Sequence, residues 1–120
     1  MCEEDIYQLM LGCRPKDYPA LLDGAPGAKI AAWWDRAVDV IPAGGGKGIG
    51  IEKTLAYYGL DKAEALAFGD GNNDREMLQA VGTGVAMENG SPELKALADE
   101  ICGPVYEDGI YHYCTSKGLI

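Results

Sequence analysis

The first third of the chain alternates short apolar segments with turn residues. Residues 5–13 alternate loosely between apolar and polar and predict a strand. Pro15 fits the first turn of a short helix after it. Residues 29–40 are apolar at many positions, and an Asp-Arg pair in their middle predicts a turn between two strands. Residues 1–43 are therefore predicted to form strand, helix, strand, strand.

The pattern changes at a glycine-rich loop, residues 42–48, which is the best boundary candidate. A helix is predicted over 49–58, where apolar residues recur at i, i+4 and i+7 and a glycine follows. Further on, strands are predicted at 65–68, 84–87 and 100–102, and helices at 74–81, from Ser91-Pro92-Glu93 onward, and at 108–116. Strands that alternate with helices indicate βαβ units, so a parallel, doubly wound αβα arrangement is predicted from residue 44 onward.

The burial of two apolar segments can be predicted from their sequence. Ala65–Phe68 is an unbroken apolar run, which is typical of a strand buried on both faces of a parallel sheet. Trp33 and Trp34 lie in a predicted strand, where neighbouring side chains point to opposite faces. We therefore expect one of the two tryptophans to face the core.

Composition and charge exclude several classes of function. The 120 residues are 48% hydrophobic and 24% charged, as in ordinary globular proteins, and the length favours one domain. Ten Lys and Arg against 19 Asp and Glu give a net charge of −9, which argues against a nucleic-acid partner. Four scattered cysteines and one histidine argue against a zinc site. Since no apolar run reaches membrane-spanning length and no leader is recognisable, we expect a cytoplasmic protein with no membrane partner.

The polar loop after the strand at 65–68 is the first candidate for chemistry. Asp70 and Asp74 lie four residues apart with two asparagines between them, and such hard oxygen ligands suit Mg²⁺. Ligands of open parallel sheets gather at this end of the strands. The alternative is a Gly-Asn turn whose side chains only cap the next helix. An EF-hand is excluded, because its sixth position is Arg75 instead of Gly and its twelfth is Val81 instead of Glu.

Lys47 is the second candidate, in a Gly-Gly-Gly-Lys-Gly segment at a helix start. A lysine beside exposed helix N–H groups favours a phosphate oxygen. The segment is not a Walker A loop, since Gly48 stands where Ser or Thr must hold Mg²⁺. The alternative is a glycine linker with a solvated lysine. One helix and one strand separate Lys47 from Asp70, so both are expected at the same sheet edge around one anion, an arrangement suited to phosphoryl transfer.

Four motifs, in order, closely resemble the haloacid dehalogenase-like phosphatases, and within them the Cof-like branch. They are Lys47-Gly48, Phe-Gly-Asp-Gly-Asn-Asn-Asp at 68–74, Gly-Val-Ala-Met-Glu-Asn-Gly at 84–90 and Glu-Asp-Gly at 107–109. The resemblance implies a Mg²⁺-dependent phosphatase that hydrolyses a small phosphorylated metabolite, such as a sugar phosphate. It also implies that residues 1–43 are the remnant of a cap domain and that residues 44–120 are the C-terminal part of a Rossmann-like core.

The resemblance also implies roles for single residues. Lys47 would balance charge on the nucleophile and the phosphoryl group, and Asp70 would ligate Mg²⁺. Asp74 would belong to the metal site, supporting it through a lysine or water. Asn73, with Lys47 and Gly48, would contact the phosphate.

The family's nucleophile motif does not occur in the sequence. That nucleophile is the first Asp of an Asp-x-Asp motif, and no Asp-x-Asp is found here. We therefore expect the chain to be the C-terminal part of such an enzyme and to have negligible phosphatase activity alone. The alternative is a non-catalytic fragment that binds Mg²⁺ and phosphate or a partner.

The missing nucleophile strand has a structural consequence. By the resemblance, that strand would pair beside residues 65–68, so its absence should leave one strand edge open. We expect a second copy of the chain, the missing N-terminal segment, or residues 29–41 to cover this edge. Under the alternative hypothesis of a non-catalytic fragment, the fragment oligomerises and so covers this strand edge.

Overall fold

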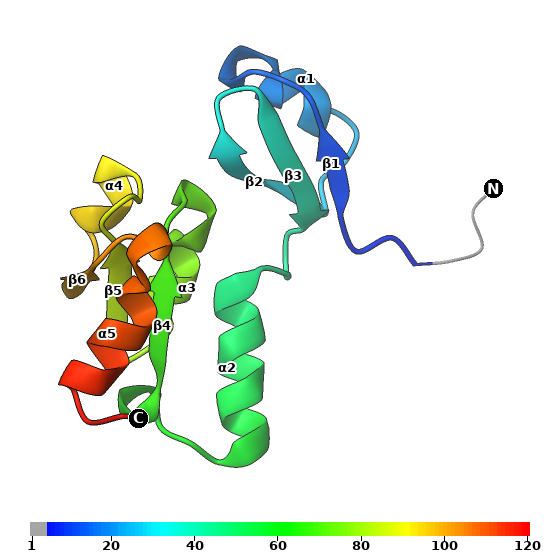
Figure 1. Ribbon diagram of the computed structural model, residues 1–120. Helices are drawn as coiled ribbons and strands as arrows, with labels where there is room; N and C mark the ends of the chain where they lie inside the picture. Colours follow the sequence, from blue (N-terminus) through cyan, green and yellow to red (C-terminus); the bar gives the residue numbers. More distant parts are fainter. Residues whose placement is uncertain (1–4) are drawn as a thin grey trace. The chain divides into compact units, whose positions relative to one another are not determined.

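The computed structural model describes residues 5–120 and divides the chain into two compact units, Met1–Gly46 and Lys47–Ile120 (Figure 1). Each unit has a three-stranded sheet of its own. The expectation of a single domain from length is therefore wrong, because the chain forms two separate sheets. Within residues 5–120, none of the helices has the length and apolar character needed to span a membrane.

The first unit is an antiparallel sheet with a short helix. Its elements are β1 (Leu9–Leu11), a 3₁₀ turn at Pro15–Asp17, α1 (Tyr18–Leu22), β2 (Ala28–Trp34) and β3 (Ala37–Pro42). The strand order is β1-β3-β2, and the predicted Asp-Arg turn joins β2 to β3. Val38, the second residue of β3, is fully buried. The predicted order of elements is confirmed, although β1 is shorter than predicted, since only Leu9–Leu11 pair with β3.

The two tryptophans of β2 both face outward, so the expectation that one faces the core is wrong. Trp33 is 43% exposed and Trp34 is 56% exposed. The pairing register with β3 shifts between Ala32 and Trp34, which breaks the strict alternation of faces. The two rings instead stack on each other, with centroids 6.4 Å apart.

The second unit is the predicted parallel α/β arrangement. Its elements are α2 (Lys47–Tyr58), β4 (Leu66–Gly69), α3 (Arg75–Gln79), β5 (Thr83–Met87), α4 (Pro92–Lys95), β6 (Glu100–Cys102) and α5 (Gly109–Ser116), with 3₁₀ turns at Lys62–Glu64, Asn72–Asp74 and Val105–Glu107. The strands pair in parallel in the order β4-β5-β6. The Rossmann-like α/β class is therefore confirmed.

Two apolar clusters on opposite faces of this sheet make the layers. On one face, Leu78 of α3 and Leu94 of α4 pack with Ala86 of β5. On the other face, Val85 and Met87 pack with Cys102, and Tyr113 of α5 lies against them. Because β5 alternates its side chains between the two clusters, helices cover both faces of the sheet (Figure 1).

Strand β4 differs from β5 in burial. Gly84–Met87 of β5 are buried, whereas Leu66, Ala67 and Phe68 of β4 are only half-buried. The prediction that this segment is buried on both faces is wrong, because β4 lies at the edge of the sheet and pairs only with β5 among the described residues. The predicted open edge is present. Residues 29–41 lie in the β2–β3 hairpin of the first unit's sheet and are not a strand of the β4 sheet. What covers the edge of β4 stays a prediction.

The predicted helix ends of the second unit are confirmed in their local geometry. Gly59 has a φ of 66°, and the N–H of Leu60 donates to the carbonyl of Leu55 at 3.0 Å, which closes α2. The hydroxyl of Ser91 accepts a hydrogen bond from the N–H of Leu94 at 3.2 Å and caps α4. Helix α2 begins at Lys47 instead of residue 49. Lys47 is therefore fixed by the first turn of a helix and not by a free linker.

Candidate functional site

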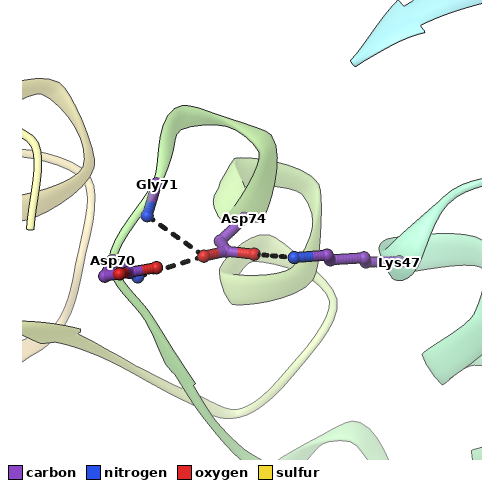
Figure 2. Close-up of polar contacts among 4 residues, drawn as sticks. All are labelled: Lys47, Asp70, Gly71 and Asp74. Carbon is purple, nitrogen blue, oxygen red and sulfur yellow. Dashed lines mark hydrogen bonds and ion pairs between the residues drawn. The ribbon is translucent and has the colours of Figure 1, made fainter. Parts of the chain in front are cut away.

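The loop that follows β4 is closed by the side chain of Asp74. Oδ2 of Asp74 accepts hydrogen bonds from the N–H of Asp70 at 3.0 Å and of Gly71 at 3.1 Å. The N–H of Asp74 donates to the carbonyl of Gly71 at 3.0 Å. Figure 2 shows Asp74 at the centre of these contacts. Asp74 is only 4% exposed, so the carboxylate that holds the loop through these hydrogen bonds is buried.

Lys47 approaches the same carboxylate from the start of α2. Its Nζ donates to Oδ1 of Asp74, across 27 positions of sequence (Figure 2). The side chain of Lys47 is 50% exposed, whereas that of Asp74 is 5% exposed. The structure thus brings the lysine and the carboxylate-rich loop together, and about half of the lysine side chain is open to solvent.

The charge state of Asp74 follows from its partners. Burial is the largest single influence and raises the pKa of Asp74. The hydrogen bonds from Lys47 and from the N–H groups of Gly71 and Asp70, together with the charge of Lys47, outweigh burial and lower the pKa from its ordinary value. Asp74 is therefore ionised at neutral pH and forms an ion pair with Lys47.

Glycines allow the backbone segments around Asp74 to approach one another. A Cβ on Gly69 would lie 2.8 Å from the Cβ of Asp74. A Cβ on Gly48 would lie 2.8 Å from the carbonyl oxygen of Glu76, in the backbone of α3. The two glycines therefore let the loop fold over Asp74 and let α2 sit close to α3, which places Lys47 within reach.

The loop after β5 supports the loop after β4. The N–H of Ser91 donates to the carbonyl of Asp70 at 2.9 Å, and its hydroxyl donates to Oδ1 of Asn72 at 2.7 Å. From the sequence, Ser91 is predicted only as a helix cap, and this second role is not predicted. A serine that caps one helix gives no sequence signal for a contact 19 positions away.

The remaining predicted residues lie in or beside this loop. Asn73 is half-buried, and within residues 5–120 its side chain has no hydrogen-bond partner. Gly48 is buried in the first turn of α2. The structure thus places both residues next to the Lys47–Asp74 pair in sequence, while their contact with phosphate stays a prediction.

The donor set fits a hard cation only in part. The carboxylate of Asp70 is exposed and accepts no hydrogen bond from the described residues, whereas both oxygens of Asp74 already have donors. Residues 5–120 contain no group of three His, Cys, Asp or Glu placed to hold a metal ion. Mg²⁺ in proteins takes one or two carboxylates together with waters and phosphate oxygens. Asp70 alone fits such a ligand, and metal ligation by Asp70 and Asp74 stays a prediction.

Comparisons with known proteins identify relatives of the chain. The chain is 41% identical over 117 residues to "Putative phosphatase YkrA" of Bacillus subtilis (strain 168), and the match covers 98% of this chain and 45% of that protein. It is 31% identical to the 5-amino-6-(5-phospho-D-ribitylamino)uracil phosphatase YitU of the same organism, over 92% of this chain and 43% of that protein. The chain thus spans less than half the length of these two relatives.

The fold of the chain is also similar to that of a solved structure. A sugar phosphatase of subclass IIB of the haloacid dehalogenase (HAD) superfamily superimposes with a TM-score of 0.87 and 31% identity, over 98% of this chain and 45% of that one. The family model for haloacid dehalogenase-like hydrolases matches residues 5–114. The chain therefore belongs to the haloacid dehalogenase-like hydrolase family.

Proposed function

We propose that the chain supplies the C-terminal half of the active site of a Mg²⁺-dependent phosphatase, a phosphoric monoester hydrolase. The observation that carries the proposal is the contact between Lys47 and Asp74 beside the exposed carboxylate of Asp70, at the end of β4. Family membership and the phosphatase names of the relatives support it. The substrate would be a small phosphorylated metabolite such as a sugar phosphate, as the sugar phosphatase among the similar structures suggests.

Lys47 would bind and orient the phosphoryl group. Its ammonium carries three N–H donors, of which one is engaged by Asp74, so the others can face a phosphate oxygen. The ionised Asp74 would hold the lysine in place. The half-buried amide of Asn73 and the backbone of Gly48 would add neutral donors to the same oxygens. The chain thus provides charge neutralisation that is organised before the substrate binds.

Asp70 would hold the metal ion. When bound, Mg²⁺ supplies positive charge and orientation at the phosphoryl oxygens. The hydrogen bond from Ser91 N–H to the carbonyl of Asp70 and the bond from Asp70 N–H to Asp74 fix the backbone on which that carboxylate stands. Because the backbone N–H and carbonyl of Asp70 are both hydrogen-bonded, its carboxylate would hold the metal ion at a fixed position.

The aspartyl nucleophile would come from outside these 120 residues. No Asp-x-Asp motif occurs in the sequence, and the relatives named above are more than twice as long as the matched part. Residues 1–43 would belong to a cap domain of the whole protein and residues 44–120 to its core. The activity, substrate and partners of that whole protein are part of this proposal.

Binding of metal and phosphate by the chain itself tests the site. We expect MgCl₂, added to the chain in a constant concentration of inorganic phosphate, to raise its melting temperature further, and Asp70→Asn to abolish this Mg²⁺-dependent rise. Glu52→Gln is the matched control, because Glu52 is an exposed acid of α2 outside the site. An equal rise in wild type and Asp70→Asn would contradict the proposed metal role of Asp70.

A second candidate, a fragment that associates without turnover, is favoured by the open edge of β4. An edge strand with half-buried apolar residues and a free row of backbone groups is a template for pairing with another strand. If a second copy covers this edge, the sedimentation-derived mass of the chain will rise with concentration and amides of Leu66–Gly69 will become protected from exchange. A chain that stays monomeric, with β4 amides exchanging freely at every concentration, would exclude this candidate.

A further inference from the structure

A hollow on the first unit gathers most of the positive charge of that unit. It measures about 360 Å³ and is lined by Gly12, Cys13, Arg14, Lys16, Asp17 and Arg36. Residues 5–46 contain four Lys and Arg, and three of them are among these lining residues. The hollow is therefore a local site of positive charge on a chain whose net charge is −9.

Strand pairing explains how two distant segments form the hollow. Strands β1 and β3 are antiparallel, with Leu11 opposite Val38. The residues just after β1 therefore lie beside the turn that precedes β3, and a Cβ on Gly12 would be 3.8 Å from the carbonyl oxygen of Arg36. This pairing brings Arg36 to the segment that carries Arg14 and Lys16.

The cations of the hollow are poorly neutralised by the protein. Among the described residues, the side chains of Arg14 and Lys16 have no ion-pair partner. The carboxylate of Asp17 accepts a hydrogen bond from the backbone N–H of Arg14 at 3.1 Å, which ties it to the turn. Asp35 approaches Arg36 only to 3.9 Å, and both side chains are more than 60% exposed, so this pair contributes little.

The side chain of Arg36 also packs against an aromatic ring. Its guanidinium carbon lies 5.8 Å from the ring centroid of Trp34, a cation–π distance. The contact restricts the long side chain without using its N–H donors. Guanidinium groups present these donors in a planar fork that matches the two oxygens of a carboxylate or phosphate.

We propose that this hollow binds the oxyanion group, phosphate or carboxylate, of a small metabolite. Its volume is within the usual range for small-molecule sites, and three cations against one carboxylate among the lining residues favour a ligand with negative charge. The hollow belongs wholly to the first unit. The proposal therefore does not depend on the Lys47–Asp74 site or on phosphatase activity.

The test is a titration of the full chain with simple oxyanions, followed by the backbone amide signals of the ¹⁵N-labelled protein. Inorganic phosphate and acetate are added in separate arms at constant ionic strength, with chloride as the reference anion. We expect saturable shifts for residues 12–17 and 36, and the stronger arm identifies which oxyanion the hollow prefers. Shifts that chloride reproduces, or shifts confined to residues 47 and 70–74, would overturn the proposal.

Variants separate this hollow from the other site. In Arg14→Gln/Arg36→Gln, half-saturation at residues 12–17 should need at least ~10-fold more oxyanion, since two charge-assisted contacts are lost. Lys47→Gln and the control Lys53→Gln, an exposed lysine of α2, should titrate like wild type at these residues. Lys16→Gln serves as a second variant if circular dichroism shows that the double variant is not folded. An unchanged titration in the folded hollow variants would refute the proposal.

Discussion

At the scale of single residues, Asp74 connects the loop after β4 with the start of α2. Its two oxygens accept hydrogen bonds from Lys47, Asp70 and Gly71, and it is almost completely buried. From the sequence, the order of elements predicts Asp70 at the same sheet edge as Lys47, and the family resemblance implies that Asp74 supports the site through a lysine or water. The sequence does not predict which oxygen meets which donor, because these contacts depend on how tightly α2 packs against α3.

The lowered pKa of Asp74 makes a prediction about stability and pH. The carboxyl titrates near its ordinary value of 3.8 in the unfolded chain and at lower pH in the folded chain. Its contacts therefore stabilise the fold fully above the unfolded pKa, and this contribution is lost as pH falls through the folded pKa. We expect Asp74→Asn to lower the free energy of unfolding by about 1–3 kcal/mol at neutral pH and to have much less effect near pH 2.

Urea denaturation followed by far-UV circular dichroism at both pH values measures this difference. Asp23→Asn is the control, because Asp23 is exposed and lies outside the site. A destabilisation by Asp74→Asn that is the same at neutral and acidic pH would show that the ionised carboxylate is not the stabilising group.

At the scale of elements, the packing of α2 against α3 decides whether Lys47 reaches the loop. Sequence patterns predicted both helices and their approximate ends, because apolar spacing and terminal glycines act over a few residues. They did not predict that Gly48 lies under the backbone of α3. The sequence predicts a loop over residues 42–48 with the helix from residue 49, whereas in the structure Lys47 and Gly48 are the first residues of that helix.

Gly48→Ala tests this helix contact. The new Cβ would lie 2.8 Å from a backbone carbonyl oxygen, which cannot move aside as a side chain can, so α2 must shift away from α3. We expect a destabilisation of about 1–3 kcal/mol and weaker Mg²⁺- and phosphate-induced stabilisation.

Gly50→Ala is the matched control in the same helix. A Cβ there would meet no atom within 4 Å, and alanine favours helix, so this variant should be more stable by about 0.5–1 kcal/mol. Thermal unfolding followed by circular dichroism compares the two. If Gly48→Ala were as stable as Gly50→Ala, the close approach of the two helices would not limit the site.

At the scale of the whole molecule, the chain has two units with separate sheets and the open edge of β4. The parallel sheet carries Lys47, Asp70 and Asp74 but no Asp-x-Asp motif. Charge neutralisation without a nucleophile does not cleave a phosphate ester by the covalent route that the family resemblance implies.

The 120-residue chain is therefore expected to hydrolyse p-nitrophenyl phosphate with Mg²⁺ no faster than its Asp70→Asn variant. Release of p-nitrophenolate by the purified chain measures this directly. Robust hydrolysis that requires Mg²⁺ and is lost in Asp70→Asn would show that the chain holds a complete active site, and would overturn the proposed external nucleophile.

The sequence by itself determined the order of strands and helices, the parallel sheet from residue 44 onward and the family. These features follow from side-chain periodicity, turn residues and motif spacing, which are encoded over short stretches. Only the tertiary structure decided that Lys47 pairs with Asp74, that Ser91 supports Asp70 and that Arg36 joins Arg14 at one hollow. It also decided that β4 is half-buried and that both tryptophans face outward. These contacts join residues far apart in sequence, and they depend on strand register and helix packing, which no local pattern specifies.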